Sequence, residues 1–115
     1  MKAILLALTL VSSLSAQPDE LTGLLRIIRA REPGASPGSV SDKTIDTAKE
    51  VFSGISFLHK TSKEVIALLG APSEKMKDAW VETLDYRFDS GFGGWEYSLS
   101  LRGDRVFKIE VVGID

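Results

Sequence analysis

Cysteine is absent from this 115-residue sequence, and its absence removes several kinds of chemistry at once. Without thiols the chain has no disulfides, no thiolate metal ligands and no cysteine nucleophile. A lipid attached to an N-terminal cysteine is excluded for the same reason. Packing must therefore stabilise the fold, and the 43% content of hydrophobic residues is adequate for that.

The chain has no excess of positive charge, and it has little histidine. The net charge is -2, so the composition does not favour a nucleic-acid partner. His59 is the single histidine, and no serine and aspartate stand in a pattern that marks a triad with it. We expect His59 to be a loop residue rather than a general base.

Only one long apolar run occurs, at the N-terminus. Met1 and Lys2 supply a positive start, residues 3–11 are apolar apart from Thr9, and residues 12–16 are mostly small. This order is typical of a secretory signal peptide. A membrane anchor is the alternative, but nine residues at 1.5 Å each cover about half of a ~30 Å hydrocarbon core. We therefore predict a signal peptide over 1–16 and an exported, periplasmic or secreted protein.

Residues 17–40 are predicted to be a helix followed by a linker. Apolar residues recur at helical spacing from Leu21 to Ile28, which indicates an amphipathic helix ending near Arg31. Two prolines and two glycines in the nine residues from Glu32 to Val40 cannot continue that helix. This linker suggests a loosely attached helical arm.

Two further helices are predicted from their caps. Ser41 is a suitable N-cap for a helix that runs to about Gly54 and has one apolar face. Thr61 and Glu64 have the spacing of a capping box ahead of a second, short helix. That helix ends at Gly70, and Pro72 prevents it from continuing.

From residue 80 onward the apolar period changes to two, which predicts strands. Three strands joined as an antiparallel meander account for the pattern, with a tight turn at Gly103–Asp104 and a longer loop over 89–94. We expect one face of the sheet to meet the helices, with these residues: Leu84, Tyr86, Phe88, Trp95, Tyr97, Leu99, Leu101, Phe107, Ile109 and Val111. The other face carries mixed charges and is expected to be solvated.

The predicted fold is thus α+β, with two helices on a three-stranded antiparallel meander over 41–115. The order of elements resembles the SmpA/OmlA family, the small BamE-like proteins of outer-membrane protein assembly. The residues that carry the resemblance lie within Ser41 to Gly113: the run from Thr61 to Pro72, then Trp80, then Asp85-Tyr86-Arg87-Phe88.

The resemblance implies a non-enzymatic envelope protein that contacts other envelope proteins and needs no cofactor. It also implies an α-α-β-β-β fold like half of a β-lactamase-inhibitor protein. Family members of the assembly machine carry a lipid on a cysteine after the leader, whereas Gln17 stands there in this chain. A secreted inhibitor or peptide-binding module of the same fold is the alternative. A hydrolase with a site between two copies is a third class.

The candidate protein-binding residues are Phe92, Trp95 and Arg87. Phe92 stands in the loop over 89–94, where a large ring either contacts a partner or packs back over Trp95 or Trp80. The latter is the more favoured interpretation. Because Gly91-Phe92-Gly93-Gly94 joins two strands rather than a strand and a helix, a phosphate-binding loop is disfavoured.

Two other charge patterns have a functional and a structural interpretation. Asp85 and Glu96 lie on the same predicted face and can mimic a glycosidase carboxylate pair, but Arg87 and Lys108 nearby favour ion pairing. Three arginines of the first helix, at positions 26, 29 and 31, can make weak contact with anionic lipid headgroups. A solvated helix face is the favoured alternative.

Overall fold

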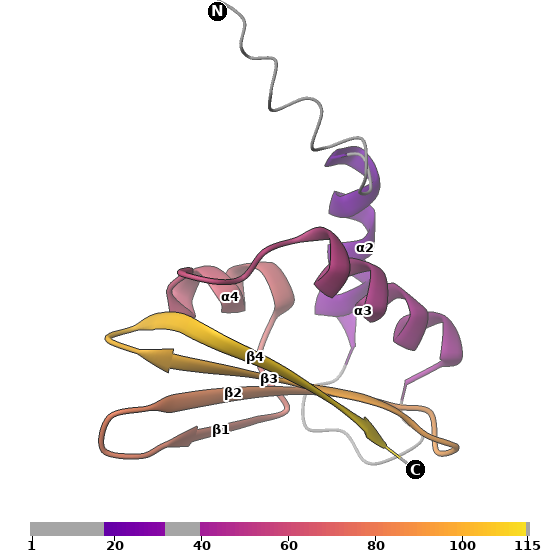
Figure 1. The fold of residues 1–115 in the computed structure, drawn as a ribbon. Helices are drawn as coiled ribbons and strands as arrows, with labels where there is room; N and C mark the ends of the chain where they lie inside the picture. The colour runs from indigo at the N-terminus through magenta and orange to yellow at the C-terminus, as the bar shows by residue number, and fades with distance from the viewer. Residues whose placement is uncertain (1–17, 32–39, 115) are drawn as a thin grey trace, which may run out of the picture.

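The computed structural model describes residues 18–31 and 40–114. They form three helices followed by four strands: α2 (Pro18–Ala30), α3 (Asp42–Gly54), α4 (Ser62–Leu69), β1 (Glu74–Lys77), β2 (Glu82–Asp89), β3 (Gly94–Arg102) and β4 (Arg105–Ile114). The strands pair in the order β1-β2-β3-β4, all antiparallel. The helices lie on one face of this meander (Figure 1). The α+β class is confirmed.

Both predicted helix caps are present. The Ser41 hydroxyl accepts a hydrogen bond from the Thr44 amide at the start of α3. At α4 the Thr61 hydroxyl accepts from the Glu64 amide, and the Glu64 carboxylate accepts from the Thr61 amide. That second bond lowers the pKa of Glu64. The caps begin both helices where the sequence predicts because they satisfy amides that have no partner inside the helix.

The sheet has one strand more than predicted. β1 reads Glu-Lys-Met-Lys, and all its side chains are exposed, so it has no apolar alternation by which a strand is recognised. It forms because its backbone pairs with the edge of β2, from Glu74 opposite Asp85 to Lys77 opposite Glu82. Trp80 lies in the turn that follows, outside any strand.

A β-bulge in β4 changes the side of one predicted core residue. Leu101 pairs with Val106, but Ser100 pairs with Lys108, so Phe107 is an extra residue on β4. Val106 is fully buried, whereas Phe107 is exposed and its ring lies under the Arg102 guanidinium at 4.5 Å. The assignment of Phe107 to the inner face was wrong, because the insertion reverses the alternation at that point.

The core lies between the three helices and the inner face of the sheet. Its buried hydrophobic residues are Leu25, Ile28, Val40, Ala48, Val51, Phe57, Val65, Leu69, Leu84, Tyr86, Phe88, Tyr97, Leu99, Leu101 and Val106. Ile109 packs against this cluster while partly exposed. The alternating residues of β2, and those of β3 from Tyr97 to Leu101, therefore meet the helices as predicted, whereas Trp95 is 39% exposed and outside the core.

Helix α2 is part of this core rather than a loose arm. Leu25 and Ile28 are buried against α3 and α4. The Arg29 guanidinium donates to the Leu68 carbonyl oxygen. Arg31 donates to the carbonyl oxygens of Leu69 and Ala71. The prediction of a solvated arginine face was wrong for Arg31, which is partly buried, whereas Arg29 is exposed as predicted. Both side chains hold the end of α2 against the C-terminal end of α4.

Arg31 is enclosed without a carboxylate partner. Its guanidinium carbon lies 5.2 Å from the ring centroid of Tyr86 and 5.0 Å from that of Phe88. Burial lowers the pKa of Arg31 and raises the pKa of Tyr86 to about 12. The Tyr86 hydroxyl donates to the Gly70 carbonyl oxygen at 2.8 Å. Cation–π contact and helix C-terminal carbonyls together offset the loss of water around the charge.

Two sequence predictions fall outside the described residues. The signal peptide predicted over residues 1–16 and most of the linker predicted up to residue 40 fall on residues 1–17 and 32–39, which the structure does not describe. Among the residues that are described, none of the helices has the length and apolar character that crossing a bilayer requires.

Replacing Arg31 tests its role in joining α2 to α4. Arg31→Met keeps the apolar stem but leaves the α4 carbonyl oxygens without these donors, so we expect the free energy of unfolding to fall by about 2 kcal/mol. Arg29→Met is the matched control, since Arg29 is exposed and makes one such bond; its loss should stay below about 1 kcal/mol. Urea unfolding measures both. Equal effects would contradict a special role for Arg31.

Candidate functional site

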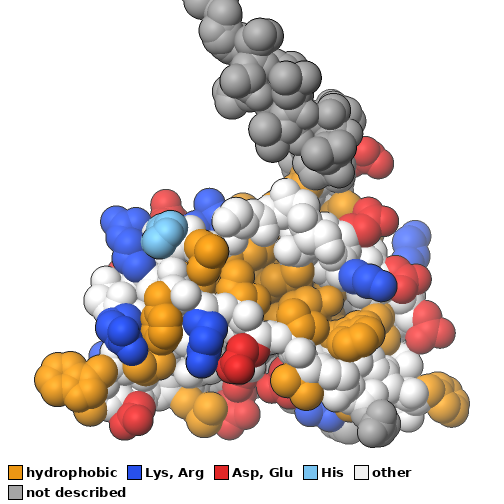
Figure 2. Space-filling model, in the orientation of Figure 1, with side chains coloured by type: hydrophobic (Ala, Val, Ile, Leu, Met, Phe, Trp, Pro, Cys, Tyr) orange, Lys and Arg blue, Asp and Glu red, His pale blue; other side chains and the backbone are white. Residues whose placement is uncertain are grey.

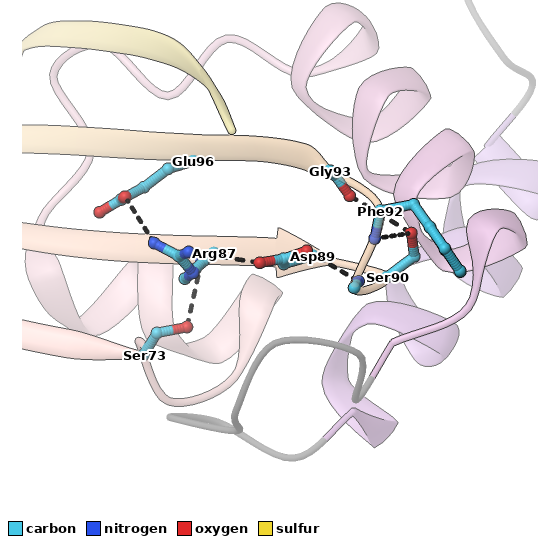
Figure 3. A network of polar contacts seen from close by, with 8 residues as sticks. Ser73, Arg87, Asp89, Ser90, Phe92, Gly93 and Glu96 are labelled. Carbon is cyan, nitrogen blue, oxygen red and sulfur yellow. Dashed lines mark hydrogen bonds and ion pairs between the residues drawn. The ribbon is translucent and has the colours of Figure 1, made fainter. Parts of the chain in front are cut away.

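The three predicted binding residues gather at one end of the sheet, around the β2–β3 hairpin. Arg87 lies on the outer face of β2, and Trp95, the second residue of β3, lies on the inner face opposite Phe88. Phe92 stands at the tip of the connecting loop (Figure 3). The hairpin therefore brings the three residues to one end of the molecule, but it does not bring them to one face.

The hairpin loop is held by its own polar groups (Figure 3). One Asp89 carboxylate oxygen accepts from the Gly91 amide at 2.8 Å, and the other lies 3.3 Å from the Arg87 guanidinium. The Ser90 amide donates to the Gly93 carbonyl oxygen, and the Ser90 hydroxyl accepts from the Phe92 amide. These bonds fix the path of the loop although none of them involves the Phe92 ring.

Glycine is required at two positions of this loop by close contacts. Gly94 has a φ of 159°, and a Cβ there would lie 1.8 Å from the Phe88 carbonyl oxygen. A Cβ on Gly93, whose φ is 124°, would lie 2.8 Å from the Ile114 carbonyl oxygen. Side chains are thus excluded on one side of Phe92 by the geometry of the chain.

Phe92 does not pack back onto the protein. Its side chain is 98% exposed, so the favoured prediction, packing over Trp95 or Trp80, was wrong. Trp80 itself is 83% exposed in the β1–β2 turn, at the opposite end of the strands from the β2–β3 loop. Phe92 lies in the loop beyond Asp89 and Gly94, the last paired residues of the two strands. Its ring therefore has no surface of its own hairpin to cover.

Arg87 is neutralised by carboxylates on both sides. Besides Asp89, its guanidinium lies 3.6 Å from Glu96, its direct neighbour on β3. The pKa of Asp89 is lowered, first by the hydrogen bond from the Gly91 amide and further by Arg87. The predicted ion pairing of Glu96 is confirmed. Arg87 consequently acts as a structural brace of the loop base.

Asp85 and Glu96 do not form a carboxylate pair of the glycosidase kind. Asp85 is opposite Ser98 in the register, and its carboxylate accepts from the Ser98 hydroxyl at 2.6 Å. Asp85 is also buried on the outer face, which was expected to be solvated. Glu96 instead faces Arg87, so the two carboxylates have separate partners.

Trp95 lines an apolar trough on the inner side of the sheet. One hollow of about 260 Å³ lies between α3 and β4 and is lined by Lys49, Phe52, Ser53, Trp95, Tyr97 and Val111. Phe52 and Tyr97 stack at its base, with ring centroids 3.9 Å apart. Figure 2 shows hydrophobic side chains gathered in this hollow between the helices and the sheet.

A second hollow extends the trough toward the Phe92 loop. It has a volume of about 430 Å³ and is lined by Asp42, Ile45, Ser90, Phe92, Gly93, Gly94, Trp95, Gly113 and Ile114. Trp95, 39% exposed, lines both hollows. The sequence did not predict this surface, since it assigned Val111 and Trp95 to a covered core face.

His59 has a structural role in its loop, as predicted. His59 adopts a φ of 71°, and its amide donates to the Val106 carbonyl oxygen in the loop before α4. A larger hollow of about 780 Å³ lies at the far end of the sheet, between Trp80 and the Gly103–Asp104 turn. No cluster of three or more histidine, aspartate or glutamate side chains suited to a metal ion occurs in residues 18–31 and 40–114.

The predicted binding residues Phe92 and Trp95 lie on two surfaces, the Phe92 hairpin and the trough beside β4. Both are built on the three-helix, four-strand α+β fold. Searches against protein-family models, curated proteins and solved structures found no match to this chain. The hairpin and the trough are therefore judged on their own contacts and exposure.

The role of Asp89 predicts a pH dependence. Because its pKa is lowered in the folded protein, the Asp89 carboxylate stabilises the fold above the unfolded-state pKa of about 4, and this contribution is lost as the pH falls through the folded value. Asp89→Asn should therefore be destabilised at pH 7, and the difference from wild type should shrink below about pH 4. Urea unfolding across pH measures this. Asp46→Asn, exposed on α3, is the control, and a pH-independent Asp89→Asn difference contradicts the prediction.

Proposed function

We propose that this chain is a non-enzymatic protein-binding module of the cell envelope and that its Phe92 hairpin is the principal contact. The observation that carries the proposal is the 98% exposure of Phe92 on a loop whose backbone is hydrogen-bonded at each end. A large aromatic ring that is exposed on a supported loop suits the role of an anchor that inserts into a partner.

The loop is suited to binding because little of it needs to be ordered on contact. Asp89, Ser90 and Gly93 already hold the backbone, so burying the ring costs mainly the side-chain entropy of one phenylalanine. Preorganisation of this kind raises affinity without adding contacts.

The surroundings of Phe92 have the composition of a binding site. Trp95 and Ile45 line the second hollow together with Phe92 on the inner side. The paired Arg87 and Glu96 supply a charged margin on the outer side. An apolar centre with a polar rim is the usual arrangement of a protein-binding hot spot.

The resemblance to the SmpA/OmlA family directs the proposal to the envelope. Two features support an envelope location. The order of elements agrees with the resemblance: α3, α4, the Gly70-Ala71-Pro72 turn and strands β2 to β4. The signal peptide predicted from residues 1–16 is the second feature. Helix α2 and strand β1 are additions to the α-α-β-β-β order that the resemblance implies. We therefore propose envelope proteins as partners, with at most weak contact to anionic lipids.

A second candidate function uses the same hairpin. A secreted inhibitor inserts a rigid loop into an enzyme cleft, and the loop over 89–94 has the rigidity and the exposed ring that this requires. The two candidate functions differ in the protein that binds the hairpin. It is an envelope assembly component in the first case and a soluble enzyme in the second.

Photo-crosslinking from position 92 tests the proposed function. We expect a crosslinker placed at Phe92 to capture an envelope protein in intact envelopes. Phe92→Ser should weaken binding of that protein by about 2 kcal/mol, or roughly thirtyfold in Kd, because a buried aromatic anchor is lost. Titration calorimetry with the captured protein measures the change.

Trp80→Ser is the matched control, since Trp80 is also an exposed aromatic residue in a turn but lies at the other end of the sheet. Its Kd should equal that of wild type. Capture at position 92 no stronger than at position 80 contradicts the proposal. Capture of an enzyme whose turnover falls when the purified chain is added favours the inhibitor instead.

A further inference from the structure

Strand β4 is a long edge of the sheet with apolar residues exposed along it. It runs from Arg105 to Ile114, and among the described residues no strand pairs with it on the side away from β3. Val111 is 53% and Val112 57% exposed. Long, exposed, apolar edges are sites at which another strand pairs.

The first two residues of β4 are already covered. The Val106 amide donates to the Lys60 carbonyl oxygen at 2.9 Å, and the Val106 carbonyl oxygen accepts from the His59 amide at 2.8 Å. Arg105 forms a bridge with Thr61. The loop before α4 therefore occupies the outer edge at 105–106, and only the part of β4 beyond it is open to another strand.

The open amides follow from the register. Val106 faces the core, and its amide points away from β3, toward the loop. In a strand the side-chain face and the amide direction alternate together. The residues beyond the bulge that share the inner face pair with Leu99, Tyr97 and Trp95 of β3, and their amides therefore point to the open side: Ile109, Val111 and Gly113.

We propose that β4 pairs antiparallel with β4 of a second copy of this chain, about a two-fold axis at Val111. The open residues Ile109 and Gly113 are spaced equally on either side of Val111, so the edge is complementary to itself. Val111 then faces Val111 of the second copy, and Ile109 faces its Gly113. These pairs each exchange two hydrogen bonds and join the two sheets edge to edge.

The two registers nearer to the loop, with axes at Glu110 and at Ile109, are excluded by residues in the structure. An axis at Glu110 places two carboxylates directly opposite each other, which is unfavourable. It also sets Ile114 of the second copy against Val106, whose amide and carbonyl are already bonded to the loop. An axis at Ile109 places Val112 of the second copy opposite Val106, so more of the second strand overlaps that loop. The axis at Val111 is the first that clears the loop, with Ile114 of the second copy opposite Lys108.

The side chains at this axis suit a second copy. Val111 lines the hollow with Phe52, Trp95 and Tyr97, so the two hollows meet at the axis and the apolar rings lose contact with water. On the outer face Glu110 is paired with Lys108 of its own strand at 3.7 Å, which reduces repulsion between the copies. The other edge, β1, is short and carries two lysines and a glutamate, features that discourage pairing.

The molecular mass of the protein in solution tests whether two copies associate. We expect light scattering or sedimentation of the purified chain to show a mass twofold that of the monomer, falling to the monomer on dilution. Val111→Lys should abolish the dimer because it places two like charges at the axis. Met76→Lys is the matched control: Met76, 51% exposed, lies on the opposite edge strand, and the dimer should persist. Circular dichroism confirms that both variants are folded.

The register has an independent test, because the chain has no cysteine of its own. In the proposed pair the two Val111 Cα atoms lie about 5.5 Å apart, within the disulfide range of about 4.4–6.8 Å. Val111→Cys should form a disulfide dimer under mild oxidation. Met76→Cys should not. Hydrogen exchange should show protection of the Ile109, Val111 and Gly113 amides that increases with protein concentration.

Each contrary result overturns the proposal. A mass that stays monomeric at all concentrations excludes the second copy, and protection of the same amides by an added extended apolar peptide would then assign the edge to a peptide. A dimer that survives Val111→Lys, or that fails to crosslink through Val111→Cys, places the interface elsewhere. Phe92→Ser leaves this axis intact, so failure of the dimer and failure of the proposed function are distinguishable.

Discussion

The hydrogen bonds at the C-terminal end of α4 hold α2 and α4 to the sheet. Arg31, directly after α2, and Tyr86 from β2 donate to the carbonyl oxygens of Leu69, Gly70 and Ala71. A helix end buried without such donors is costly. Because the donors come from two different elements, satisfying this one helix end also sets the position of α2 and of α4 over β2. The cation of Arg31 is accepted there by aromatic faces as well as by carbonyls.

This placement leaves the sheet unevenly covered. The helices bury the inner faces of β2 and of much of β3, whereas Ile109 and Val111 of β4 remain partly exposed. The loop before α4 covers the outer edge of β4 at Arg105 and Val106. The trough lined by Phe52, Trp95 and Val111 is the consequence. The asymmetry arises because two of the helices are fixed above β2.

The shape of the Phe92 hairpin, the second contact surface, is set by residues within the loop itself. Gly93 and Gly94 pass too close to carbonyl oxygens to carry side chains. Asp89 and Arg87 brace the base of the loop, so the Phe92 ring is the only large apolar group presented there. The same loop carries the proposal of an envelope interaction module and the alternative of an inhibitor, since both require a rigid apolar projection.

The sequence alone determined the elements whose signals are local: the Ser41 and Thr61 caps, the stop at Gly70, and the inner faces of β2 and β3. It also selected Phe92 and Trp95 as candidate site residues. Only the tertiary structure decided that α2 docks, that a polar segment becomes β1, that Phe107 turns outward and that Phe92 stays exposed. Caps and alternation depend on neighbours within a few residues, whereas docking, edge pairing and bulges depend on partners far along the chain.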